Sequence, residues 1–179
     1  MPAKPSVAWS VPIAAADVAE TGRHVDLVAD EKAREAIAKI ANLNALPRLE
    51  ADFDLTRHGS GGLHVSGRVA ATVVQTCVVT LEPVESVIEE SVDLVFQPEA
   101  AANDASSGDH TLEAEDPPEA LRDGVVDLGV VATEFLLLGI DPYPRQAGVA
   151  FDAPAADDPS SHPFAALAAL KKDGTGNPR

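Results

Sequence analysis

The clearest pattern in the chain lies at residues 49–73, LEADFDLTRHGSGGLHVSGRVAATV. Apolar and polar side chains alternate on both sides of a glycine-rich link, Gly59 to Gly62. A period of two residues is typical of a strand that has one buried face and one wet face. The stretch therefore predicts a β-hairpin whose turn contains the glycines.

The elements on either side extend this pattern. Alternation over residues 84–96 predicts a third antiparallel strand. Alternation over 9–13 predicts a short strand, which Pro12 restricts to a sheet edge or a strand end. Residues 30–43 change to a helical period, and Asp30 stands at the N-cap position. We therefore expect a helix beside an antiparallel meander.

A second helix is expected after the meander. Asp127 is placed to cap residues 128–138, which are apolar on most sides and therefore belong in a core or against a partner. Together these elements predict an α+β fold, in which two helices pack against an antiparallel β-sheet meander. The sheet is expected to be either open or curved and barrel-like.

We expect one globular domain with five consecutive parts. Residues 98–124 contain eight acidic residues against one basic residue and no aromatic residue, which is typical of a flexible insertion. The parts are residues 1–29, an N-terminal strand and lead-in; 30–97, the helix and three-stranded meander; 98–124, the acidic flexible insertion; 125–151, the apolar core helix and a Pro-rich turn; and 152–179, a linker, a short C-terminal helix and a tail.

The overall charge narrows the classes of function. The 179 residues include 29 Asp and Glu but only 13 Lys and Arg, a formal charge of −16 at pH 7. This charge repels phosphate, which argues against nucleic-acid binding by bulk neutralisation and against an anionic membrane as partner. Neither a secretory signal nor an apolar stretch of membrane-spanning length is evident. We predict a cytoplasmic protein that contacts no membrane.

No catalytic or metal-binding pattern emerges from the reactive side chains. Cys77 is the only cysteine, and its neighbours supply no base or cation that would lower the pKa of the thiol, so a small buried residue is the expected role. The histidines lack any familiar ligand spacing. They are His24, His58, His64, His110 and His162. We predict a non-enzymatic protein with no catalytic residue, metal, cofactor or small-molecule substrate.

Two sets of side chains are candidates for binding. The first is a local basic patch on or beside the hairpin, formed by Arg57, His58, His64 and Arg68, and suited to a phosphate contact. The second is Phe164, Leu167 and Leu170, which recur at helical spacing and are placed to dock on the body of the domain.

Several motifs together resemble the YceD family. They are QTCVVTLEP at 75–83, VDL at 126–128, EFLLL at 134–138, PYP at 142–144 and HPFAALAALK at 162–171. The resemblance runs from about residue 46 to residue 172 and implies a role in the accumulation of large-subunit ribosomal RNA and in ribosome assembly. Many family members carry Cys-x-x-Cys, whereas here Thr80 follows Cys77 at the second position. One thiolate cannot close a structural zinc site, so no metal is expected.

The leading hypothesis is therefore a factor that binds a ribosomal protein or an assembly intermediate. Under this hypothesis the acidic stretch 98–124 masks basic tails by charge complementarity, although a purely solubilising loop explains the same composition. The alternative is direct binding of ribosomal RNA through the hairpin patch. A third interpretation, a hydrolase or thiol enzyme, requires a histidine within hydrogen-bond reach of Cys77.

Overall fold

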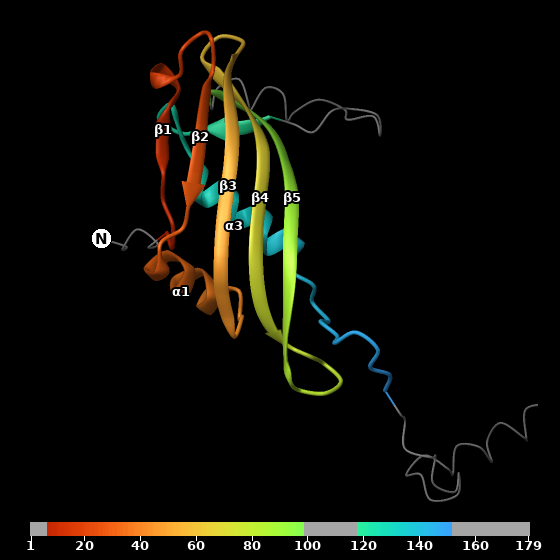
Figure 1. Ribbon diagram of the computed structural model, residues 1–179. Helices are drawn as coiled ribbons and strands as arrows, with labels where there is room; N and C mark the ends of the chain where they lie inside the picture. The colour runs from red at the N-terminus through yellow and green to blue at the C-terminus, as the bar shows by residue number, and fades with distance from the viewer. Residues whose placement is uncertain (1–6, 99–117, 152–179) are drawn as a thin grey trace, which may run out of the picture. The chain divides into compact units, whose positions relative to one another are not determined.

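The computed structural model describes residues 7–98 and 118–151 (Figure 1). The chain forms two compact units, Met1–Ala147 and Gly148–Arg179, and the fold below is that of the described residues of the first. Its strands are β1 (Pro12–Ala14), β2 (Arg23–Val28), β3 (Ala45–His58), β4 (Gly62–Thr76), β5 (Pro83–Pro98), β6 (Glu119–Leu121) and β7 (Val125–Asp127). Its helices are the 3-10 turn η1 (Ala15–Asp17), α1 (Glu31–Ile40) and α3 (Leu128–Gly139).

The main sheet has five strands in the order β2-β3-β4-β5-β6. Strands β2 to β5 pair antiparallel with their sequence neighbours, whereas β6 lies parallel to the end of β5. Strand β1 pairs with β7 in a separate two-stranded sheet. The meander and the α+β class are confirmed, but the sheet ends at β2 and β6 and is not closed into a barrel.

The alternation in sequence sets the two faces of the sheet. Phe53 and Leu55 on β3, and Leu63 and Val65 on β4, are fully buried on the inner face. Helix α3 covers this face, passing behind β3, β4 and β5 in Figure 1. Burying these apolar side chains between sheet and helix supplies the main stabilisation of the domain.

The structure confirms the prediction that the glycine-rich link forms the turn of a β-hairpin. Strand β3 ends at His58 and β4 begins at Gly62, which pairs with it. Gly59 and Gly61 have positive φ angles of 54° and 89°. Glycine adopts this left-handed region without the steric penalty that a Cβ atom imposes.

Both helices begin at the expected cap residues. The Asp30 carboxylate accepts a hydrogen bond from the Ala33 amide at 2.7 Å. The Asp127 carboxylate accepts from the Gly129 and Val130 amides of α3 and also from the Val11 amide at 2.8 Å. Asp127 therefore joins the start of α3 to the residues before β1.

Some boundaries differ from the sequence expectation. The first strand begins at Pro12 rather than Trp9, and it lies outside the main sheet, next to β7. Strands β2 and β6 were not indicated by the pattern, and β6 lies within 98–124, so regular structure extends into that range. The expected flexibility of residues 99–117 and the expected C-terminal helix lie outside the described residues. Among the described helices, none combines the length and the hydropathy needed to cross a membrane.

Candidate functional site

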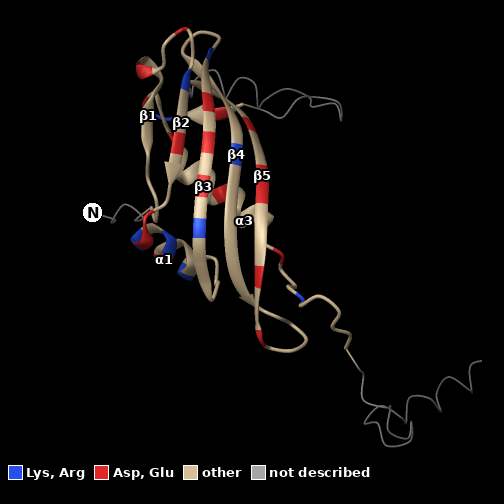
Figure 2. Ribbon diagram, in the orientation of Figure 1, with Lys and Arg blue, Asp and Glu red and all other residues tan. Residues whose placement is uncertain are grey.

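The outer face of the main sheet is the broad polar surface of this unit. The term outer face means here the side of strands β2 to β5 that lies opposite α3. Figure 2 shows acidic positions recurring along β3 and β5, and the strand register places most of them on this side. Its acidic residues are Asp26, Glu50, Asp52, Asp54, Glu85, Glu89 and Asp93, and its basic residues are Arg48, Arg68, His24 and His64. Seven carboxylates against two arginines give the face a formal charge of −5 when both histidines are neutral.

Two histidines on this face contact carboxylates of neighbouring strands. His24 Nδ1 lies 2.8 Å from Asp54 Oδ1 and His24 Nε2 lies 3.2 Å from Asp26 Oδ1. Hydrogen bonding to Asp54, and then to Asp26, raises the pKa of His24 above its ordinary value. His64 Nε2 lies 2.8 Å from Asp93 Oδ1 on β5. Protonation of His24 at lower pH therefore adds positive charge to a face that is otherwise anionic.

The two arginines on the outer face also lie beside carboxylates. Arg48 Nη2 lies 2.6 Å from Glu50 Oε2, and this hydrogen bond lowers the pKa of the Glu50 carboxyl. Arg68 Nε lies 3.5 Å from Asp52 Oδ2. All four side chains are substantially exposed, so each pair contributes little to stability. The pairs do show that this face accommodates guanidinium groups.

The hairpin residues predicted to bind phosphate do not share one surface. His64 and Arg68 lie on the outer face, and His58 lies at the exposed end of β3. Arg57 has the parity of the inner face, and its Nε donates to the Val18 carbonyl at 2.8 Å. A role for these four residues in binding RNA stays a prediction. Phe164, Leu167 and Leu170 lie outside the described residues.

Cys77 is fully buried in the turn that follows β4. Its Sγ accepts hydrogen bonds from the Thr80 amide at 3.5 Å and the Gln146 amide at 3.4 Å. Hydrogen bonding by the Thr80 side chain, and then by the backbone amides of Thr80, Gln146 and Val79, lowers the pKa of the thiol from 9.0 to about 6. The Thr80 donors lie only three residues from Cys77, whereas the Gln146 donor is 69 residues away in sequence, so the full set of hydrogen bonds forms only in the folded chain.

The low pKa of Cys77 predicts a pH-dependent stability. Between pH 6 and pH 9 the folded thiol is mainly deprotonated, whereas the unfolded thiol retains its proton. The unfolded chain then binds more protons, so the free energy of unfolding should rise with pH across this range. Urea unfolding at several pH values measures this rise, and the variant Cys77→Ala should lose it. Parallel pH profiles for the two proteins would contradict the prediction.

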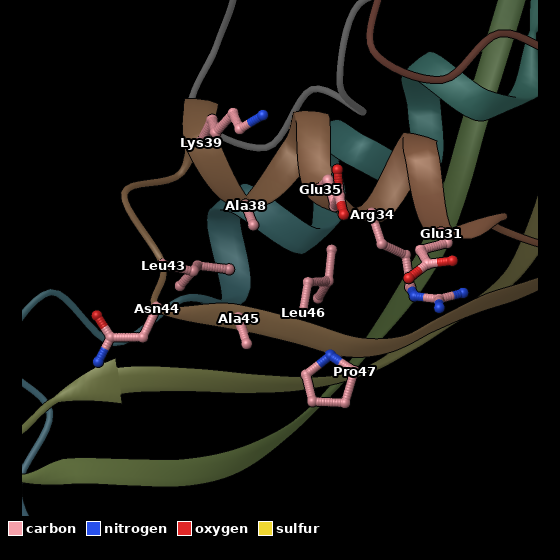
Figure 3. Close-up of a pocket in the computed structure, with 10 residues that line it drawn as sticks. All are labelled: Glu31, Arg34, Glu35, Ala38, Lys39, Leu43, Asn44, Ala45, Leu46 and Pro47. Carbon is pink, nitrogen blue, oxygen red and sulfur yellow. The ribbon is translucent and has the colours of Figure 1, made fainter.

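The described residues contain no group of three or more His, Cys, Asp or Glu side chains placed to hold a metal ion. A hollow of about 330 Å³ lies between α1 and the start of β3 (Figure 3). Charged side chains of α1 line one side of it, and Leu43 to Pro47 line the other. Arg34 at its rim donates to the Ala29 carbonyl at 2.6 Å.

One comparison with known proteins identifies a matching protein family. A family model described as "Large ribosomal RNA subunit accumulation protein YceD" matches residues 65–171, which is more than half of the chain. The match includes most of β4, and all of β5, the Cys77 turn and α3. No curated protein and no solved structure matches the chain.

Proposed function

Because the chain belongs to the YceD family, we propose that it supports the accumulation of large-subunit ribosomal RNA as a non-enzymatic factor in ribosome assembly. The match over residues 65–171 carries this proposal. In the proposed role the protein binds a ribosomal protein or an assembly intermediate in the cytoplasm. Neither a cofactor nor a small-molecule substrate takes part.

Charge supports a protein partner over RNA. The chain has a formal charge of −16, and the outer face has an excess of carboxylates over arginines. Large-subunit particles contain basic proteins as well as RNA, and only the basic proteins are attracted to such a face. The acidic stretch 98–124 adds to the same attraction if it masks basic tails.

Direct contact with ribosomal RNA is the competing proposal. It uses Arg57, His58, His64 and Arg68, which lie on or beside the β3–β4 hairpin. His64 and Arg68 contact Asp93 and Asp52, so a phosphate group would have to approach past both carboxylates. Repulsion of this kind weakens an RNA contact at low salt, where phosphate binding is normally strongest.

Recovery of the tagged chain from growing cells tests the proposed function. We expect large-subunit proteins to co-purify, and we expect them to remain bound after nuclease treatment. Deleting the gene should lower the amount of large-subunit RNA relative to small-subunit RNA. Recovery of neither subunit's components, together with unchanged RNA levels, would overturn the proposal. Ultraviolet cross-linking to RNA that persists after the outer-face carboxylates are replaced by amides, but is lost after Arg57 and Arg68 are replaced by alanine, would favour the competing proposal.

A further inference from the structure

We propose that the outer face binds an extended, lysine- or arginine-rich segment of a partner protein, which runs along β4 between two lines of carboxylates. The partner's identity as a ribosomal protein rests on the proposed function above, whereas the binding chemistry rests on the face itself. Beyond the family assignment, this inference names the surface, the direction of the segment and the kind of side chain that it takes.

The register of β3, β4 and β5 creates two matching rows across the face. In one row Glu50 and Glu89 flank the small residue Ala70. In the other, Asp54 and Asp93 flank Ser66. Neighbouring strands are about 4.8 Å apart, so the paired positions in each row are separated by roughly 10 Å. A lysine or arginine head group over the small residue would have a carboxylate on either side. Three of these four carboxylates already contact a basic side chain of the face, which the head group would join or displace.

The spacing between the two rows selects an extended ligand. Ser66 and Ala70 are four residues apart on β4, which corresponds to about 13 Å along a strand. An extended peptide presents every second side chain on one side. Basic residues at every fourth position of such a peptide therefore meet both rows at once.

The protein's own side chains illustrate how this binding works. Between the two rows lies Arg68, whose Nε is 3.5 Å from Asp52 Oδ2. Beside these residues, Asp26 and Glu50 line a shallow hollow of about 420 Å³. Val28 at its edge has 72% of its surface exposed, and Val87 farther along the face has 68%. The methylene groups of lysine or arginine pack on such apolar patches while their charges stay with the carboxylates.

Charge favours a cationic peptide on the outer face over a second copy of the chain and over RNA. A second copy of the chain would place one anionic face against another, and RNA would bring further negative charge. Only a cationic segment lowers the electrostatic energy of the face. Because the carboxylates remain exposed to solvent, each contact is weak and sensitive to salt.

Peptide binding to the full-length protein tests the inference. The probe is a fluorescent Gly/Ser/Thr peptide with three lysines, one at every fourth position, measured by anisotropy at pH 8 and low salt. A composition-matched peptide with its three lysines in succession is expected to bind more weakly. In the double variant Glu50→Gln, Glu89→Gln we expect the affinity for the spaced peptide to fall about five- to tenfold.

The control variant removes the same charge away from the face. Glu20→Gln with Glu82→Gln should change the affinity less than about twofold, because neither position lies on β2 to β5 of the outer face. Equal losses in the two double variants would overturn the inference, as would amide shifts confined to other elements in spectra of the labelled protein. If the peptide fails to bind while large-subunit proteins still co-purify, this surface is wrong but the proposed function stands. If the peptide binds but large-subunit proteins do not co-purify, the binding surface stands and the proposed function is wrong.

Discussion

Replacing Phe53 by alanine is expected to lower the free energy of unfolding by about 3–5 kcal/mol. Phe53 is fully buried in the middle of β3, opposite Val25 of β2 and Gly67 of β4. Removing the ring leaves a cavity that the strands on either side cannot fill without moving. Because a domain of this size is stabilised by roughly 5–15 kcal/mol, the variant should unfold at a markedly lower urea concentration.

A matched control for this variant lies on the same strand. Thr56 is exposed on the outer face, so Thr56→Ala should change the free energy of unfolding by no more than about 0.5 kcal/mol. Chemical unfolding followed by circular dichroism measures both variants. A loss of less than about 1 kcal/mol for Phe53→Ala would mean that the ring does not occupy the closely packed core described above.

Replacing Gly67 by alanine is the second change with a large expected effect. A Cβ atom at Gly67 would collide with the Asp52 carbonyl oxygen and would lie 2.9 Å from Cδ1 of Phe53. The first of these obstacles is backbone, so a side-chain rotation cannot relieve it. We expect a loss of about 1–3 kcal/mol in the free energy of unfolding, from strand displacement.

The neighbouring position provides the comparison for Gly67. Ser66→Ala changes a side chain on the outer face and should leave stability nearly unchanged, which thermal unfolding of both proteins can show. A Gly67→Ala variant as stable as the Ser66→Ala variant would contradict the close approach of β3 to β4 at this point. If both variants retained the stability of the unchanged protein, the result would also argue against the strand register on which the proposed binding rows depend.

The long elements were predictable because their patterns are local and repeat several times. Strands β3 to β5 each alternate over many residues, and both long helices begin at capping aspartates that are visible in the sequence. Strand β2 has only two apolar residues with the parity of the inner face, Val25 and Leu27, so its alternation is too short to stand out. Strand β6 is three residues long and pairs in parallel with a segment more than 20 positions earlier. No local signal specifies such a pairing.

The candidate site was harder to predict because it depends on register. The sequence indicates a wet face with carboxylates, but the proximity of His24 to Asp54 requires the pairing of β2 with β3. The position of Arg57 was indicated by its parity with Phe53 and Leu55, whereas its acceptor, the Val18 carbonyl, was not. The low pKa of Cys77 depends first on Thr80, three residues away in a turn whose geometry the sequence does not reveal, and then on the Gln146 amide, which is 69 residues away.

The bond between Asp127 and Val11 has a consequence for how the protein is made. These residues are 116 positions apart, so at about 5–20 residues per second the N-terminal segment waits roughly 6–23 s for its partner during translation. Strands β2 to β5 leave the ribosome before α3, so their apolar inner face is not yet covered by this helix when β5 has emerged. The nascent chain thus passes through a stage with an exposed hydrophobic sheet. This stage ends when α3 emerges and the Asp127 carboxylate accepts its hydrogen bond from the Val11 amide.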